Sequence, residues 1–458
     1  MSLLIIIPAF LVTIGVLVTV HEFGHFWVAR KLGVKVLRFS IGFGKPLWKR
    51  VSKDSDHIEY VVAALPFGGY VKMLDERECE EGCHIPEQDL PRAFNRQVLW
   101  KRAAIVLAGP MANFLLAITV YAAVGMLGQE VRYAYVEPVA GTPAAEAGFQ
   151  SGDKVTSIGG KPVYAMGEMP MRLIDAYFAS AEHRVVVGVE TPDGVPAERV
   201  MSLQGAALLE KDNDVMEKLG FGPWMPPFDL ILEQVIPDSP AAEAGLLAGD
   251  KILQADGKTF SNPQPFSKYI ADHPEQPVSL LVSRADGNHE VQVVPRMDAE
   301  RNRVMVGIAF KRPPDNIQDQ LYFEQSYGLF DSLVKGVEQT ADTSIMTLKL
   351  MGRMLTGEVA LKNISGPVTI AQFAGVTASI GLTYYLGFLA VVSVSLGVLN
   401  LLPIPMLDGG HLLYYLIELV KGSPVSEEVE AAGFRVGMAI IAGLMMLALY
   451  NDFMRLIN

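Results

Sequence analysis

The sequence of 458 residues contains little cysteine and little charge. Its two cysteines cannot build the disulfide framework of a small secreted domain, so that class is excluded. Charged residues make up 19% of the chain and apolar residues 50%, and the mean hydropathy is +0.28. These values are too apolar for an ordinary soluble enzyme and predict a chain that is part membrane and part globular. The net charge of −12 argues against nucleic acid as a general partner.

Three long stretches contain no charged side chain at all: Leu3–Val20, Ala103–Leu127 and Asn363–Leu407. The first would form roughly 27 Å of helix, enough to cross a bilayer core. The third is too long for one crossing, so we expect a helix together with a re-entrant or surface-lying segment. A fourth, shorter candidate is Val436–Tyr450, which needs Arg435 to extend toward the membrane interface.

The charges that flank the first stretch predict its orientation. Between Arg30 and Arg50 there are seven basic residues and no acidic one, so this flank is expected in the cytoplasm. Four spans then place both termini and the region of about residues 129–360 outside the cytoplasm, which is the periplasm in a double-membrane bacterium. Cys79 and Cys83 fall in the cytoplasmic loop and should stay reduced; with His84 they are a weak alternative metal fragment in what is otherwise a solvated loop.

The first apolar stretch runs directly into the motif His21-Glu22-Phe23-Gly24-His25. On a helix, His21 and His25 share one face, where both imidazoles can bind one zinc ion. Glu22 lies close enough to accept a proton from an activated water. The alternative is a structural role, in which the histidines bond to neighbouring helices. Polar groups in lipid are costly and usually functional, so the motif favours hydrolysis inside the membrane.

A catalytic zinc needs a third protein ligand and an open position for water. The candidates within the predicted membrane region are Asp408 and His411. Asp408 follows the long uncharged run, where Pro403 and Pro405 break a helix. Lipid tolerates such a break only where the backbone faces protein or a cavity, which favours Asp408 over His411.

The predicted outer region contains an internal repeat. Residues 141–155 (GTPAAEAGFQSGDKV) are echoed by residues 238–252 (DSPAAEAGLLAGDKI), at an offset of 97 residues. This spacing is that of a small domain, and each copy reads as a short helix, a turn and a strand. The pattern resembles bacterial PDZ domains, which bind extended peptides at a sheet edge. Beyond the repeat, residues 312–365 show near-helical apolar spacing, typical of one or two helices packed on the membrane surface or on the PDZ pair, or of ordinary linker helices.

Three short segments after the zinc motif, Ser40–Lys45, Ile58–Val62 and Gly68–Met73, alternate like strands with glycine turns. A substrate helix must be unwound before cleavage, and a strand edge could satisfy its freed backbone groups by β-addition. We therefore expect substrate contacts at Gly42, Phe43 and Gly44. The alternative is a cytoplasmic hairpin that makes no contact with substrate.

The HEFGH motif on a first span, together with the later sequence NLLPIPMLDGG (residues 400–410), resembles the site-2 protease family of intramembrane metalloproteases over essentially the full length. The resemblance implies one zinc ion per chain held by His21, His25 and Asp408, with Glu22 as the catalytic base. It also implies a membrane-reentrant β-loop after the first span. Residues with an implied substrate-handling or site-shaping role are Asn400, Pro403 and Pro405, and Asn113, which closes the second-span motif Gly109-Pro110-Met111-Ala112-Asn113.

The predicted fold is a polytopic α-helical membrane protein with four transmembrane helices, a membrane-reentrant β-loop and two periplasmic PDZ domains of the α+β class. The predicted segments are a first span (1–30), a cytoplasmic or re-entrant β region (31–97), a second span (98–128), PDZ domains (129–220 and 221–311), amphipathic periplasmic helices (312–365), a membrane-associated segment with the third span (366–408), a cytoplasmic-side segment (409–432) and the fourth span with its tail (433–458).

The resulting functional hypothesis is a zinc metalloendopeptidase of a bacterial inner membrane, acting as a monomer near the cytoplasmic face. By resemblance, the substrates are single-pass proteins: an anti-sigma factor already cut once, whose cytoplasmic fragment is released in an envelope-stress response, and remnant signal peptides. One alternative is a membrane-tethered PDZ scaffold or sensor with a structural metal site. Another is a metal or proton transporter, although that class usually repeats its spans rather than its soluble domains.

Overall fold

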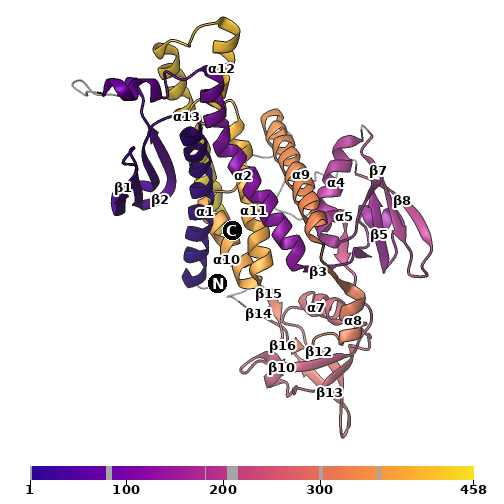
Figure 1. Ribbon diagram of the computed structural model, residues 1–458. Helices are drawn as coiled ribbons and strands as arrows, with labels where there is room; N and C mark the ends of the chain where they lie inside the picture. The colour runs from indigo at the N-terminus through magenta and orange to yellow at the C-terminus, as the bar shows by residue number, and fades with distance from the viewer. Residues whose placement is uncertain are drawn as a thin grey trace. The chain divides into compact units, whose positions relative to one another are not determined.

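The computed structural model describes residues 3–78, 85–180, 182–203, 215–298, 303–357, 362 and 364–457. The chain forms two compact units, drawn together in Figure 1. The first contains Met1–Gln129 and Gln325–Asn458, and the second contains Glu130–Leu208 and Asn213–Glu324. Cys79, Cys83 and His84, and with them the weak metal fragment, lie outside the described residues.

The first unit is built mainly of helices. Within the described ranges, four helices are long and apolar enough to cross a membrane. Their bounds are α1 (Leu3–Lys31), α2 (Leu99–Leu127), α11 (Leu382–Leu401) and α13 (Glu427–Ile457). The last is much longer than the short candidate in the sequence, because the helix continues through charged residues at both ends.

The long uncharged stretch before Asp408 is divided at Gly381, as its length requires. It forms α10 (Pro367–Ile380) and α11, then an irregular segment, and α12 (Asp408–Lys421) follows. Asp452 of α13 accepts hydrogen bonds from the amides of Gly366 and Val368, which satisfies the start of α10.

The region between α1 and α2 contains two long strands, β1 (Val36–Val51) and β2 (Glu59–Met73), and two short 3₁₀ turns, Glu76–Glu78 and Glu87–Arg92. Both strands bend, so the segments pair in the order 46–51, 59–63, 36–41, 69–73. Gly42 and Gly44 have φ values of 89° and 87°, which permits the bend. Phe26 of α1 packs against Phe39 and fixes the sheet beside the helix.

The amphipathic segment contains α8 (Asp315–Leu321) in the second unit and α9 (Leu329–Thr356) in the first. The sequence places such helices on the membrane surface or the PDZ pair. In the structure, α9 packs along α2 and α11 instead. Gly336 makes this close approach possible, because a Cβ there would lie 2.6 Å from the carbonyl oxygen of Ile118.

The second unit contains the internal repeat as two sheets of matching strand order, β8-β7-β5-β4-β9 and β13-β12-β11-β10-β16. In the first copy, the short helix α3 (Pro143–Glu146) precedes β5 and the longer helix α4 (Met169–Ala179) follows it. In the second copy, α6 (Pro240–Glu243) precedes β11 and α7 (Pro263–Ala271) follows it. The first sheet contains β4 (Tyr135–Pro138), β5 (Asp153–Ile158) with β6 (Lys161–Pro162) beside it, β7 (Arg184–Glu190), β8 (Pro196–Ser202) and β9 (Phe221–Pro223).

The second sheet contains β10 (Leu230–Val235), β11 (Lys251–Ala255), β12 (Val278–Arg284), β13 (Gly287–Val293) and β16 (Ile308–Phe310). The remaining elements of the region are a 3₁₀ turn (Met166–Glu168), α5 (Val215–Leu219), and the paired strands β14 (Arg296–Asp298) with β15 (Arg303–Met305) and β3 (Gln129–Arg132) with β17 (Tyr322–Gln325).

The predicted end of the first PDZ domain, residue 220, comes just before the last strand of the first sheet. Phe221–Pro223 pairs with Val136–Pro138 and so completes the first sheet. In both copies the buried aspartate of the repeat, Asp153 or Asp250, bonds to an arginine of the same domain, Arg199 or Arg284.

Candidate metal centre

The HEFGH motif lies in the second half of α1, where this helix packs closely on α2. Gly24 is the residue that permits the approach, since a Cβ there would lie 2.3 Å from the carbonyl oxygen of Ala108. Small residues bring membrane helices together in this way. His21 and His25 therefore face α2, and their side chains are only 12% and 11% exposed.

The structure brings His21, His25 and Asp408 together, with ligand atoms within 4.8 Å of one another. Nε2 of His21 lies 3.2 Å from Nε2 of His25 and 3.2 Å from Oδ2 of Asp408. Nε2 of His25 lies 3.5 Å from Oδ1 of Asp408. Ligands at about 2.0 Å from a tetrahedral zinc ion are roughly 3.3 Å apart, so these separations suit that ion.

The contacts of Nδ1 in each histidine ring indicate the tautomer. In both rings Nε2, the atom that points into the cluster, carries no proton. Nδ1 of His25 lies 2.8 Å from the carbonyl oxygen of Ile105, which can only accept, so Nδ1 donates and Nε2 keeps its lone pair. Nδ1 of His21 lies 3.2 Å from the side-chain amide of Asn113, whose Oδ1 is buried without a partner. Turning this amide over lets Oδ1 accept from Nδ1 of His21 and satisfies both groups.

The atoms that face one another in the site, Nε2 of both histidines and the carboxylate of Asp408, are therefore all acceptors. Oδ2 of Asp408 is buried without a hydrogen-bond partner, and the ring nitrogen that faces it at 3.2 Å, Nε2 of His21, is an acceptor in this tautomer. Two lone pairs and a carboxylate that face each other repel unless a cation lies between them. The set of two imidazoles and one carboxylate suits zinc and leaves a fourth position open.

Asp408 is positioned by the irregular segment between α11 and α12. It is the first residue of α12, and the two glycines after it lie against the preceding backbone. A Cβ at Gly409 would be 2.2 Å from the carbonyl oxygen of Leu402, and one at Gly410 would be 2.4 Å from that of Ile404. The other end of α12 is held by an ion pair of 2.6 Å between Glu418 and Arg102 of α2.

Glu22 lies between the metal site and the β sheet. Its carboxylate is near enough to interact electrostatically with His21, His25 and Asp408. On the other side, a Cβ at Gly69 of β2 would lie 2.9 Å from Cγ of Glu22. A carboxylate this close to the three residues can accept a proton from water and return it to an amine.

The other residues that the sequence singles out lie around this centre in different environments. His411, the alternative ligand, is not in the cluster; it lines a separate cavity with Arg77 and Glu430. Asn400 is half-buried in the last turn of α11, and Pro403 in the following segment is exposed. The remaining members of the predicted set are Pro405, which is half-buried, and Gly42, Phe43 and Gly44 of β1, where Phe43 stacks on Tyr70.

Two features of the site have no separate signal in the sequence. Gly109 lies under both rings, and a Cβ there would be 2.2 Å from Nε2 of His25 and 2.9 Å from Cε1 of His21. The sequence offers Gly109 only as part of a motif, without this role. The acceptor for His25 is a backbone carbonyl, that of Ile105, which no residue type identifies.

Comparison with known proteins agrees with this geometry. The sequence matches peptidase family M50 over residues 9–444. It is 40% identical over 455 residues to the regulator of sigma-E protease RseP of Escherichia coli, covering 98% of each chain. It is 40% identical over 464 residues to protease RseP of Yersinia pestis and 37% identical over 460 residues to the regulator of sigma E protease of Haemophilus influenzae, in each case covering 100% of both chains.

Among solved structures, the PDZ domain of an SdrC-like protein from Listeria monocytogenes is 26% identical, covering 19% of this chain and 90% of that chain with a TM-score of 0.17. The family match and the identities to the full-length relatives extend over nearly the whole sequence and include both segments that form the metal centre. The chain therefore belongs to peptidase family M50, as a metalloprotease of the site-2 type.

Proposed function

We propose that this protein hydrolyses a peptide bond within the membrane-spanning segment of single-pass proteins, using one zinc ion per chain held by His21, His25 and Asp408. The convergence of these three acceptors at the membrane helices is the observation that carries the proposal. The names of the relatives add the biological setting, regulation of sigma-E, for which a membrane-anchored anti-sigma factor is the expected substrate. Remnant signal peptides are a second expected class.

The chemistry follows from the position of each side chain. When bound, zinc would supply Lewis-acid activation of a water molecule and of the scissile carbonyl. Glu22 accepts the proton of the attacking water and delivers it to the leaving amine, so the carboxylate ends unchanged. Asn113 and the Ile105 carbonyl hold the two imidazoles in the tautomer that binds metal.

Substrate binding is proposed at the edge of the β sheet. The segment of residues 69–73 pairs with β1 on one side, and no described strand pairs with its other side. This edge begins beside Glu22, since Gly69 is in contact distance of that side chain. An unwound substrate segment added to this edge would regain backbone hydrogen bonds as it reaches the metal. Gly42, Phe43 and Gly44 shape the bend, while Asn400, Pro403 and Pro405 line the break before Asp408.

The remaining elements of the proposal concern topology and selection. The basic flank after α1 supports a metal centre near the cytoplasmic face of a bacterial inner membrane. The two repeated domains then lie in the periplasm as PDZ domains and exclude substrates with bulky outer domains, so a first cleavage by another protease precedes this one. A monomer contains the whole metal centre, because all three ligands come from one chain.

The test combines cleavage with metal content. A short-tailed single-pass reporter is expressed in membranes with the native chain, Glu22→Gln or Asp408→Ala, and zinc is measured in each purified protein. We expect cleavage by the native chain alone, about one zinc per native or Glu22→Gln chain, and zinc loss in Asp408→Ala. Zinc retained in Asp408→Ala would exclude that ligand. Cleavage by Glu22→Gln would exclude Glu22 as the base, and zinc without any cleavage in the native chain would favour the scaffold with a structural metal.

A further inference from the structure

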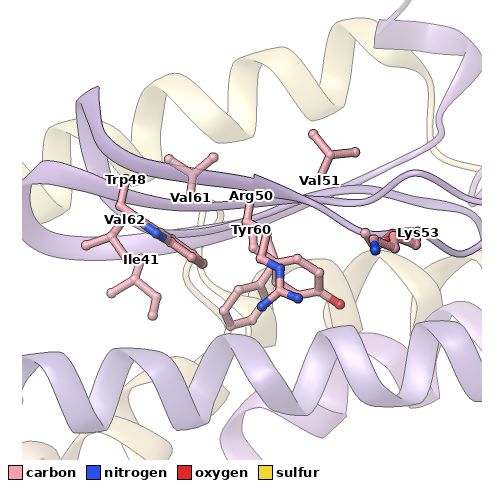
Figure 2. Close-up of a pocket in the computed structure, with 10 residues that line it drawn as sticks. Ile41, Trp48, Arg50, Val51, Lys53, Tyr60, Val61 and Val62 are labelled. Atoms are coloured by element: carbon pink, nitrogen blue, oxygen red, sulfur yellow. The ribbon is translucent and has the colours of Figure 1, made fainter.

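A cavity of about 540 Å³ lies along the β1–β2 sheet. Figure 2 shows Val51 and Val61 on one side of the strands, with Ile41, Arg50 and Tyr60 on the other. The volume is typical of ligand pockets, and the walls are mainly apolar. Its full lining is Phe39, Ile41, Trp48, Arg50, Val51, Ser52, Lys53, Tyr60, Val61 and Val62.

The strand register shows which residues of the cavity lie deeper in the membrane and which lie nearer its surface. Directly opposed residues share a face, so Arg50 and Tyr60 form one row with Phe39. Tyr60 and Phe39 contact Phe26 of α1, at ring-centroid distances of 6.0 and 5.3 Å. Phe26 is one helical turn closer than Glu22 to the basic end of α1. The cationic row is therefore the row nearer the cytoplasmic face.

The next row on the same face is apolar and lies deeper. It consists of Trp48, Val62 and Ile41, and Ile41 is opposite Gly69, which approaches Val18 and Glu22. Trp48 is 52% exposed and Val62 38%, so this row offers uncovered apolar surface. The cavity thus has an apolar end toward the membrane centre and a cationic end toward its surface.

The cations of this cavity have no counter-charge among the described residues. Two other basic side chains of the hairpin do form ion pairs: Arg38 and Lys49 both pair with Glu59. Arg50 and Lys53 form no ion pair or hydrogen bond with the part of the chain that the structure describes. Exposed, unpaired cations beside uncovered apolar walls are complementary to an amphipathic anion.

We propose that this cavity binds one anionic glycerophospholipid of the inner leaflet, with its phosphate at Arg50 and Lys53 and an acyl chain along Trp48, Val62 and Ile41. A basic juxtamembrane peptide, the usual cytoplasmic flank of a membrane protein, would be repelled by the same cations. The inference goes beyond peptide hydrolysis and rests on the proposed topology, with the hairpin in the membrane and its cationic row toward the cytoplasmic face. Bound lipid would hold the sheet whose opposite edge lies beside Glu22 at a fixed depth.

The first experiment is native mass spectrometry of the full-length protein in detergent, titrated with phosphatidylglycerol or phosphatidylethanolamine. We expect one phosphatidylglycerol to bind preferentially. Arg50→Gln with Lys53→Gln should weaken it roughly 25-fold, at about fivefold for each basic side chain near a lipid surface. The matched control, Lys49→Gln with Lys72→Gln, removes the same charge from the other face of the hairpin and should bind as the native chain does.

The second experiment locates the bound molecule with phosphatidylglycerol that carries a photoreactive acyl chain. Adducts on Trp48, Val62 or Ile41 are expected, and they should disappear in the Arg50→Gln, Lys53→Gln chain. Equal binding by the native chain and this double variant would overturn the proposal. A photoreactive residue at position 48 that captures the reporter substrate instead of lipid would also overturn it. Zinc content and reporter cleavage, measured in parallel, separate either failure from failure of the protease proposal.

Discussion

Replacing Gly109 with alanine should remove zinc from the centre while leaving the helices folded. The added Cβ would lie 2.2 Å from Nε2 and 2.5 Å from Cε1 of His25, and 2.9 Å from Cε1 of His21. Ordinary contacts of a methyl carbon are about 3.5 Å or more, so the His25 ring must move by about 1 Å. Metal sites tolerate deviations of only about 0.2 Å in ligand distance, and a displacement of about 1 Å can cost roughly 100-fold in rate.

The assay measures zinc per chain, its affinity by chelator competition, and reporter cleavage. Gly15→Ala is the matched control, because a Cβ there meets nothing within 4 Å and lies on α1, the helix that carries both histidines. Alanine favours a helix over glycine by about 1 kcal/mol, so the control should fold at least as well as the native chain. A Gly109→Ala protein with native zinc affinity and native cleavage would refute the packing of this centre.

Three further predictions concern its surroundings and the second unit. Asn113→Leu should weaken zinc binding by about 10- to 100-fold, measured by chelator competition, because His21 loses the acceptor for Nδ1; unchanged affinity would contradict that role. Gly69→Val should lower cleavage with zinc retained, because its side chain would meet Glu22. In the second unit, burial raises the pKa of Asp250, but the Arg284 guanidinium and a backbone amide outweigh this and lower it. Its contribution should be present above about pH 4 and fade as pH falls through the lowered pKa, and Asp250→Asn should cost about 3 kcal/mol of unfolding free energy in urea at neutral pH.

The sequence predicts much of this protein because its strongest signals are local. An uncharged run predicts a spanning helix by itself, and the HEFGH spacing places two imidazoles on one face before any tertiary contact is known. The repeat of residues 141–155 at residues 238–252 likewise predicts two similar domains, and the structure gives them the same strand order. The resemblance to site-2 proteases is confirmed by the match to family M50.

The parts that sequence reasoning missed depend on contacts between distant segments. Nothing in residues 36–41 shows that they pair with both arms of β2, because this register needs β2 to bend back near Gly68, whose φ is 107°. The path of α9 along α2 rests on Gly336, one small residue whose partner is more than two hundred positions away. The acceptor for His25 is a backbone atom, so its identity could not be predicted from residue types.

The glycines around the metal centre share a role that differs from conformational freedom. Gly24 and Gly109 lie within helices, and Gly409 and Gly410 begin α12. Each faces backbone or a ligand ring at a distance where a Cβ would clash. Gly24 and Gly109 therefore set how closely α1 and α2 approach, and Gly409 and Gly410 set how closely α12 lies to the segment before it. The HExxH motif on α1 supplies two of the three ligands, and α12 supplies the third. The metal geometry is therefore set by distances between helices, and changes at these interfaces should alter zinc affinity before they unfold the protein.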